Sequence, residues 1–143
     1  MGLAEWDGLI RVGRAARLLG SLRARLDEAS LLETVPPQAR VHLDAAWAEA
    51  EFRNQMVRWE RQCIERALAT YDGPIVLLKG AAYLLAELPV AHGRMPSDVD
   101  FMVPRGRLDE VETLLVSAGY QSQKVDAYDQ RYYREWAHEL PCQ

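Results

Sequence analysis

Two aspartates stand two positions apart in the segment Ser97-Asp98-Val99-Asp100-Phe101-Met102-Val103, directly ahead of an apolar run. If this segment is a β-strand, Asp98 and Asp100 point to one face, because strand side chains alternate with a period of two. Two carboxylates about 4 Å apart repel each other by roughly 4 kcal/mol at an effective dielectric constant of about 20. A cation between them offsets that repulsion, and hard oxygen ligands suit Mg²⁺. The segment therefore indicates either a metal site or a pair of surface aspartates in a turn.

A second motif, Leu77-Leu78-Lys79-Gly80-Ala81-Ala82, precedes this segment. It continues the apolar strand pattern of residues 75–78 and leads into an expected helix over residues 81–88. Glycine lets a phosphate approach the backbone, a helix N-terminus offers unpaired N–H groups, and Lys79 adds a cation. A strand–glycine–helix turn is also a common structural feature, so this motif alone does not identify a phosphate site. Together, the two motifs provide the smallest set of groups that metal-assisted phosphoryl or nucleotidyl transfer needs.

Short alternating elements are expected over residues 71–143. The pattern gives a turn at 71–74, a strand at 75–78, a helix at 81–88, a loop at 89–96, a strand at 99–103 and an amphipathic helix at 108–118. Gly119 is a plausible residue for the end of that last helix. Weaker strand patterns follow at 120–125 and 132–140. Strands interleaved with helices predict an α/β or α+β fold.

Residues 1–70 have a helical pattern and form an expected N-terminal helical region ahead of the 71–143 core. Apolar residues from Ala15 to Leu26 recur at helical spacing, with a solvated arginine face between them that consists of Arg14, Arg17, Arg23 and Arg25. Thr34-Val35-Pro36-Pro37 ends this helix, and a helix of about 30 residues, roughly 45 Å long, follows. Its apolar stripe is expected to belong to the core: Val41, Ala45, Ala48, Phe52, Met56, Trp59, Cys63 and Ala67.

The overall composition excludes several classes of protein. The chain carries 17 basic and 21 acidic residues, a net charge of −4, which disfavours a general nucleic-acid binder. No apolar run approaches the roughly 20 residues of a membrane span, and the amphipathic N-terminus is unlike a signal peptide. Cys63 and Cys142 form no CxxC pair, which disfavours structural zinc and a disulfide framework. We therefore expect a cytoplasmic protein without a membrane segment.

Three stretches resemble the uncharacterised nucleotidyltransferase family, which belongs to the DNA polymerase β-like nucleotidyltransferase superfamily. They are Leu78-Lys79-Gly80-Ala81-Ala82, the segment from Arg94 to Pro104, and Ser117-Ala118-Gly119-Tyr120. The resemblance is good over residues 75–120, about a third of the chain. It implies an α+β protein with the minimal nucleotidyltransferase fold, a small mixed β-sheet flanked by helices, here with an N-terminal helical region.

The resemblance also implies roles for individual residues. Asp98 and Asp100 occupy the positions of the two metal-binding carboxylates. Gly80 and Ala81 occupy the glycine–serine position, where Ala81 lacks the serine hydroxyl that could contact a phosphate. Lys79 and, from the loop before the carboxylates, Arg94 are candidates for contact with the nucleotide; for both, a purely structural or solvated role is the alternative.

A third carboxylate is expected from the superfamily pattern on a later strand. The chain stops at Gln143, just after His138-Glu139-Leu140-Pro141, and offers Glu139 or Asp126 as substitutes. Three alternatives stay open: the core is shortened at its C-terminus, Glu139 serves as the third catalytic carboxylate, or catalysis is impaired.

The resulting functional hypothesis is an Mg²⁺-dependent enzyme that transfers a nucleoside monophosphate from a nucleoside triphosphate to a hydroxyl acceptor. The acceptor is a small molecule, a protein or peptide side chain, or an RNA end. A catalytically impaired nucleotide-binding or regulatory module is the first alternative. The second is a helical interaction protein that forms a homo-oligomer through the N-terminal helices, with Trp47, Phe52 and Trp59 in the contact.

Overall fold

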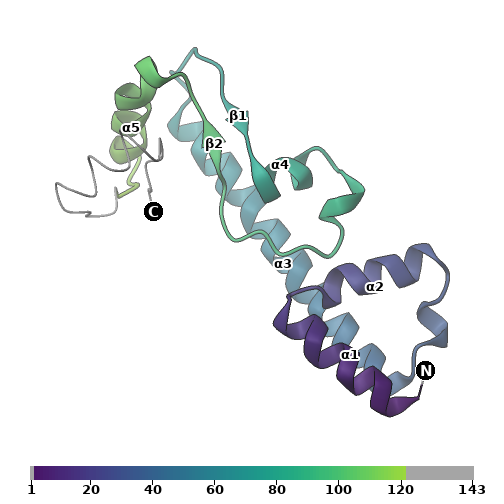
Figure 1. Ribbon diagram of the computed structural model, residues 1–143. Coiled ribbons are helices and arrows are strands. Elements are labelled where there is room, and N and C mark those ends of the chain that lie inside the picture. The colour runs from purple at the N-terminus through teal and green to yellow at the C-terminus, as the bar shows by residue number, and fades with distance from the viewer. Residues whose placement is uncertain (1, 122–143) are drawn as a thin grey trace. The chain divides into compact units, whose positions relative to one another are not determined.

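A computed structural model describes residues 2–121 of the chain. These residues form the helices α1 (Leu3–Ala15), α2 (Leu19–Glu28), α3 (Pro37–Ala67), α4 (Lys79–Leu85) and α5 (Leu108–Ser117), and the strands β1 (Val76–Leu77) and β2 (Phe101–Met102) (Figure 1). Short 3₁₀ helices lie at Leu32–Thr34, Pro89–Ala91 and Arg105–Arg107. The predicted α+β class is confirmed, and within the described residues the sheet is a single antiparallel pair. The strands expected over 120–125 and 132–140 reach outside the described residues.

The chain forms two compact units. Among the described residues, unit 1 comprises residues 2–61 and 76–102, and unit 2 comprises residues 62–75 and 103–121. Helix α3 begins in unit 1 and ends in unit 2. The expected division near residue 70 stays a prediction. In the described part of the chain, none of the helices combines the length and the apolar character needed to cross a bilayer.

Two apolar clusters hold unit 1 together. The larger one joins α1, α2 and the start of α3, and its buried residues are Trp6, Ile10, Leu19, Leu32, Val35, Ala39 and Leu43. The smaller one joins α3 to α4 and consists of Val57, Ala81, Leu84 and Ala91, with Val99 packed against it. Since each large apolar side chain contributes about 1.5 to 3 kcal/mol when fully buried, these clusters fix the positions of α1 to α4 within the unit.

Three helices of unit 1 end at a non-glycine residue with a left-handed backbone. The φ angle is +56° at Arg17, +58° at Ser30 and +53° at Glu87. The amide of Leu18 donates to the carbonyl of Gly13 at 2.8 Å, which closes the turn around Arg17 as a Schellman motif. The single helix expected through residues 15–26 was therefore wrong. The helix ends because the backbone turns at Arg17. The sequence contains no signal of this end, because the glycine that usually marks such a turn is absent.

Relief of this backbone strain gives a first prediction. We expect Ser30→Gly to raise the free energy of unfolding by about 1 kcal/mol, because a left-handed L-residue costs that much and glycine does not. Ser21→Gly is the matched control. Ser21 lies inside α2, where glycine lowers helix stability, so this variant should be less stable than wild type. Urea unfolding curves measure both, and a Ser30→Gly variant less stable than wild type would contradict the prediction.

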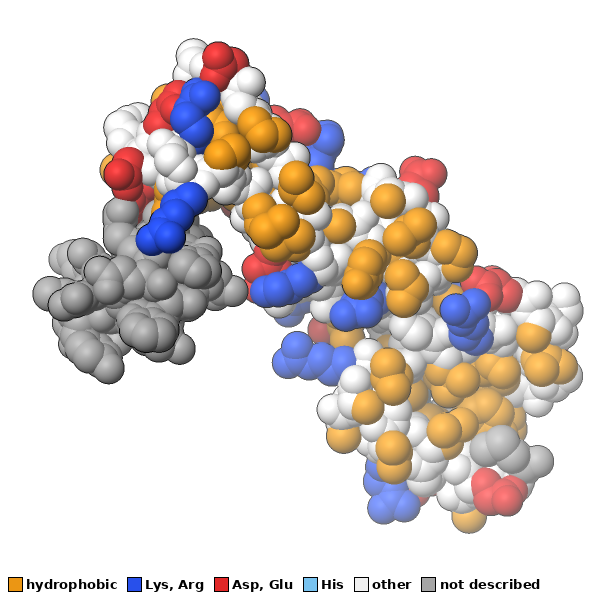
Figure 2. Space-filling view, turned by 45° about the horizontal axis from the view of Figure 1, so that its top comes forward, with side chains coloured by type: hydrophobic (Ala, Val, Ile, Leu, Met, Phe, Trp, Pro, Cys, Tyr) orange, Lys and Arg blue, Asp and Glu red, His pale blue; other side chains and the backbone are white. Residues whose placement is uncertain are grey.

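Helix α3 buries a different stripe from the one expected. Phe52, Met56 and Trp59 are 60%, 45% and 54% exposed, so their assignment to the core was wrong. The buried positions of α3 are Ala39, Leu43, Ala50, Asn54, Val57 and Ile64. Both stripes recur at three- and four-residue spacings, so periodicity alone does not decide between them. Figure 2 shows that apolar side chains, in orange, also reach the surface.

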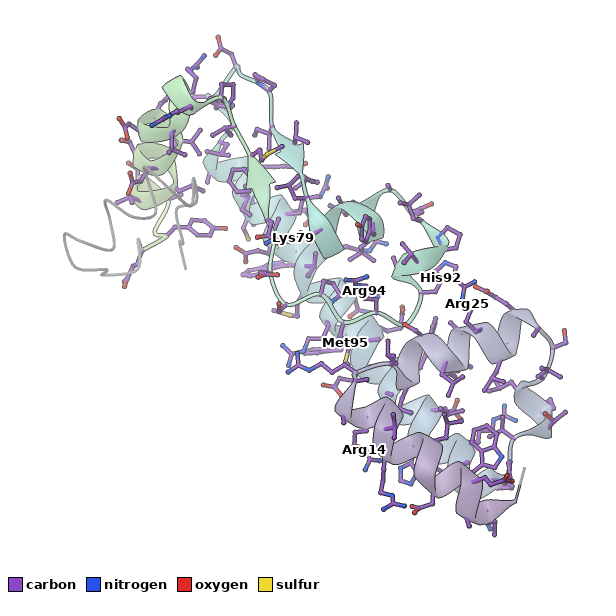
Figure 3. All side chains as sticks on the ribbon, viewed as in Figure 1. Arg14, Arg25, Lys79, His92, Arg94 and Met95 are labelled. Atoms are coloured by element: carbon purple, nitrogen blue, oxygen red, sulfur yellow. The ribbon has the colours of Figure 1, made fainter. Side chains whose placement is uncertain are left out.

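Helix α2 lies against the turn after Pro89–Ala91 through two glycines. A Cβ at Gly20 would overlap the carbonyl oxygen of Gly93, and a Cβ at Gly93 would overlap the backbone of Gly20. Beside this contact, His92 Nδ1 lies 3.0 Å from a carboxylate oxygen of Glu28 (Figure 3). Hydrogen bonds from His92 and then Arg25 lower the pKa of Glu28. The loop that leads to Asp98 is thus fixed on α2 where it begins.

In unit 2, Arg107 joins the segment at Asp72 to the start of α5. Its guanidinium donates to Asp72 Oδ1 at 2.7 Å and to Glu110 Oε1 at 3.0 Å. The same group lies 4.9 Å from the ring centroid of Tyr71, a cation–π contact. These hydrogen bonds lower the pKa of Asp72 and the pKa of Glu110.

The lowered pKa values predict an acid-sensitive contribution to stability. It is fully present above the unfolded-state pKa values of these carboxyls and is lost as the pH falls through their lower folded-state values. We expect Arg107→Met to lower Tm at pH 7, and the difference from wild type to shrink as the pH falls below about 4. Arg105→Met, which removes an exposed arginine from the same turn, is the control. A difference that stays constant across this range in thermal melts would contradict the prediction.

Candidate functional site

The β1–β2 pair brings the two sequence motifs together. Val76 pairs with Met102, and Leu77 pairs with Phe101. The Leu78 amide donates to the Asp100 carbonyl at 2.9 Å, which extends the pairing by one residue. The turn that begins at Lys79 therefore lies beside Asp100. The expected strand over 99–103 is shorter in the structure, and Asp98 lies in a bend ahead of it. Strand alternation therefore does not determine the direction of the Asp98 side chain.

Lys79 connects the turn to the carboxylates directly. Its Nζ donates to Asp100 Oδ1 at 3.0 Å, with the lysine side chain 64% and the aspartate side chain 28% exposed (Figure 3). The backbone of Lys79 is left-handed, with φ at +50°. This conformation costs roughly 1 to 2 kcal/mol for an L-residue, and such strained positions cluster at functional sites. Lys79 is thus a strained cation held against one of the two predicted metal carboxylates.

Asp98 and Arg94 lie in the loop that runs towards β2. Asp98 is exposed, and the Ser97 hydroxyl donates to its Oδ1 at 3.1 Å. The Arg94 guanidinium lies 5.6 Å from the ring centroid of Tyr83 on α4. This cation–π contact gives Arg94 a structural partner and leaves its predicted contact with a nucleotide as a prediction.

Gly80 and Ala81 each have a packing role. A Cβ at Gly80 would lie 2.9 Å from the Cβ of Pro96, closer than real Cβ atoms come, so the glycine lets the loop pack on α4. The Ala81 side chain is 1% exposed and belongs to the cluster with Val57 and Leu84. Any contact of Ala81 with a nucleotide would therefore come from its backbone. The predicted nucleotide-binding roles of both residues stay predictions.

The donor set of this site suits Mg²⁺. Asp98 and Asp100 supply carboxylate oxygens, the hard ligands that Mg²⁺ prefers, and Asp100 already attracts the Lys79 ammonium group. Within residues 2–121, the structure forms no group of three or more His, Cys, Asp or Glu side chains that could hold a metal ion. The proposed substitutes for a third carboxylate, Glu139 and Asp126, lie outside the described residues. The catalytic role of Glu139 stays a prediction.

A groove of about 590 Å³ begins at the loop that carries these carboxylates. Met95, Pro96 and Ser97 line it on the loop side, and Arg14, Arg17, His42, Glu49 and Arg53 line it from α1, the turn after α1, and α3. Figure 3 labels Arg14 on α1 and Met95 on the loop. The sequence pattern predicts a solvated face for Arg14 and Arg17 and gives no signal for Arg53. No local pattern joins these arginines, because they come from separate helices that meet only in the fold.

The comparison with known families extends beyond the motif region. The model of the uncharacterised nucleotidyltransferase family matches residues 3–141. The match includes α1, α2 and α3 as well as the two motifs, so the N-terminal helices lie within the region typical of the family. The chain matches no curated protein and no solved structure.

Proposed function

The chain belongs to the uncharacterised nucleotidyltransferase family, and from this membership and the site geometry we propose that it transfers a nucleoside monophosphate to a hydroxyl acceptor in an Mg²⁺-dependent reaction. The observation that carries the proposal is the contact between the two motifs. Lys79, from the glycine turn, lies 3.0 Å from Asp100 of the carboxylate pair. A phosphate-binding turn beside metal-binding carboxylates is what this reaction requires. A cytoplasmic location is part of the same proposal.

The chemistry assigns a task to each residue. The acceptor oxygen forms a bond to the α-phosphorus, the bond from that phosphorus to the bridging oxygen breaks, and pyrophosphate leaves with the electron pair. Mg²⁺, held by Asp98 and Asp100, would offset negative charge on the phosphates. Lys79 and Arg94 add positive charge, and the backbone at Gly80 and Ala81 lets the phosphates approach. The acceptor proton passes to a base, for which Glu139 is the candidate.

Pyrophosphate release tests the proposal. The full chain is incubated with each of the four nucleoside triphosphates and Mg²⁺, with glycerol, a serine-containing peptide and a short RNA as acceptor probes. We expect pyrophosphate release together with a gain of one nucleoside monophosphate in the mass of an acceptor, and loss of both with EDTA. Nucleotide binding without pyrophosphate release would instead support the impaired binding module. The absence of both nucleotide binding and pyrophosphate release would overturn the proposal.

Self-association through α3 is a second role that we propose. It rests on the exposure of Phe52, Met56 and Trp59, at 60%, 45% and 54%, which recur along one stripe of the helix. Exposed apolar side chains at helical spacing are typical of helix–helix contacts. Sedimentation velocity should give an oligomer for wild type and a monomer for the Phe52→Ser/Trp59→Ser double variant. A wild-type chain that stays monomeric at high concentration would contradict this role.

A further inference from the structure

The groove beside the carboxylates carries a concentration of positive charge. Arg14, Arg17 and Arg53 line it, against one lining carboxylate from Glu49. This local surplus stands out because the chain as a whole has a net charge of −4. Since guanidinium groups match the geometry of phosphate and carboxylate oxygens, such a lining favours an anionic ligand.

Several other arginines of α1, α2 and α3 have carboxylate partners. Arg11, Arg23, Arg25 and Arg40 all form ion pairs with carboxylates. Within the described part of the chain, by contrast, no carboxylate pairs with the three groove arginines. The Arg14 guanidinium lies instead 3.1 Å from Nδ1 of the His42 ring. The charge in the groove is therefore available to a ligand.

The backbone at Arg17 adds to this distinction. Arg17 adopts a left-handed conformation, with φ at +56°, at the end of α1. Glycine would relieve this strain, and the chain instead has an exposed arginine at a position that lines the groove. A cation is thus present where the backbone alone would favour a residue without a side chain.

The groove and the glycine turn both contact the loop that carries the carboxylates. Pro96 packs on Gly80, where a Cβ would meet it at 2.9 Å, and Pro96 also lines the groove. Ser97, at the edge of the groove, donates to Asp98 at 3.1 Å. Two groove residues, Pro96 and Ser97, therefore contact the Gly80 turn and Asp98. The volume of about 590 Å³ is that of a small-molecule site.

We propose that this groove binds the acceptor, and that the acceptor carries a phosphate or carboxylate group which Arg14, Arg17 and Arg53 recognise. Only the identification of the bound anion as the acceptor rests on the proposed nucleotidyl transfer. Anion binding by the groove is independent of it, because it needs neither metal nor nucleotide. The acceptor hydroxyl would then face Asp98, while its anionic group stays among the arginines. Recognition by the arginines restricts the possible acceptors from any hydroxyl compound to an anionic hydroxyl compound.

Calorimetric titration of the full chain with inorganic phosphate, and separately with acetate, tests anion binding without Mg²⁺ or nucleotide. We expect Arg53→Gln to weaken binding of the preferred anion about tenfold, the loss of one charge-assisted hydrogen bond. Arg58→Gln is the matched control, because Arg58 is an exposed arginine of the same helix that does not line the groove. The phosphate and acetate arms identify which anionic group the groove prefers.

Nucleotide titrations with Mg²⁺ on the same variants test the assignment to the acceptor. We expect Arg53→Gln to leave nucleotide affinity unchanged. Equal anion affinity in Arg53→Gln and Arg58→Gln would overturn the inference, and so would loss of nucleotide affinity in Arg53→Gln, which would make the groove part of the triphosphate site. Failure of the proposed function has a different signature: wild type binds phosphate through Arg53 but binds no nucleotide, and the acceptor assignment then falls with it.

Discussion

Replacing Asp98 or Asp100 with asparagine is expected to weaken Mg²⁺-dependent nucleotide binding by about 100-fold or more, equivalent to about 2.7 kcal/mol. Asparagine has nearly the shape of aspartate but lacks the charge that attracts a divalent cation. In Asp100→Asn the Lys79 ammonium group also loses its charged partner, which lies 3.0 Å away in the wild type. Titration calorimetry with a nucleoside triphosphate, with and without Mg²⁺, measures the change.

Asp7→Asn is the control for this pair of variants. Asp7 forms an exposed ion pair with Arg11 on α1, away from the carboxylate loop, so the same loss of charge there should leave nucleotide binding unchanged. The thermal stability of both site variants should stay close to wild type, because exposed ion pairs contribute little. Nucleotide affinity that survives in both site variants would rule out the metal role of these aspartates.

Gly93→Ala is expected to lower the free energy of unfolding by about 3 kcal/mol or more. Two costs combine at this position. The new Cβ would overlap the backbone of Gly20, and overpacking of this kind costs about 1 to 3 kcal/mol. The φ angle of +67° adds the roughly 1 to 2 kcal/mol of a left-handed L-residue. Chemical denaturation followed by circular dichroism measures the loss.

Gly8→Ala makes the same chemical change where the structure has room. A Cβ at Gly8 would meet nothing within 4 Å, and Gly8 lies inside α1, so alanine should stabilise the helix by about 1 kcal/mol. The two variants should therefore shift the unfolding midpoint in opposite directions. A Gly93→Ala protein as stable as wild type would mean that α2 does not lie against this turn.

The sequence predicted most elements of the fold and misplaced the details that depend on tertiary contacts. Residues 37–67 form the expected long helix, and the positive φ of +102° at Gly119 agrees with the expected helix end. The break at Arg17 was missed because its signal, a left-handed residue, does not require glycine when the following amides find carbonyl partners. The buried stripe of α3 was misassigned because the helix has apolar residues on two faces, and only the packing partners decide which one is covered.

The site was predictable where it depends on adjacent residues and not where it depends on the fold. The antiparallel pairing of β1 and β2 brings Lys79 to Asp100, and both residues stand in motifs that the sequence displays. The packing of Pro96 on Gly80 has no sequence signature, although it gives the glycine a structural reason. The groove was missed because Arg14 and Arg53 lie on different helices. A charged residue on a helix surface is predicted to be solvated when the sequence does not show which element packs beside it.

The length of α3 restricts which insertions and deletions the chain can tolerate. One uninterrupted helix of 31 residues carries buried positions, the α3 side of the groove at His42 and Arg53, and the exposed stripe at Phe52 and Trp59. Because an α-helix has 3.6 residues per turn, a single inserted residue rotates everything beyond it by about 100°. Point substitutions alter these surfaces one at a time, whereas a change in helix length would turn all of those beyond it at once. Natural variation in this helix should therefore consist of substitutions, with length changes confined to the turns at its two ends.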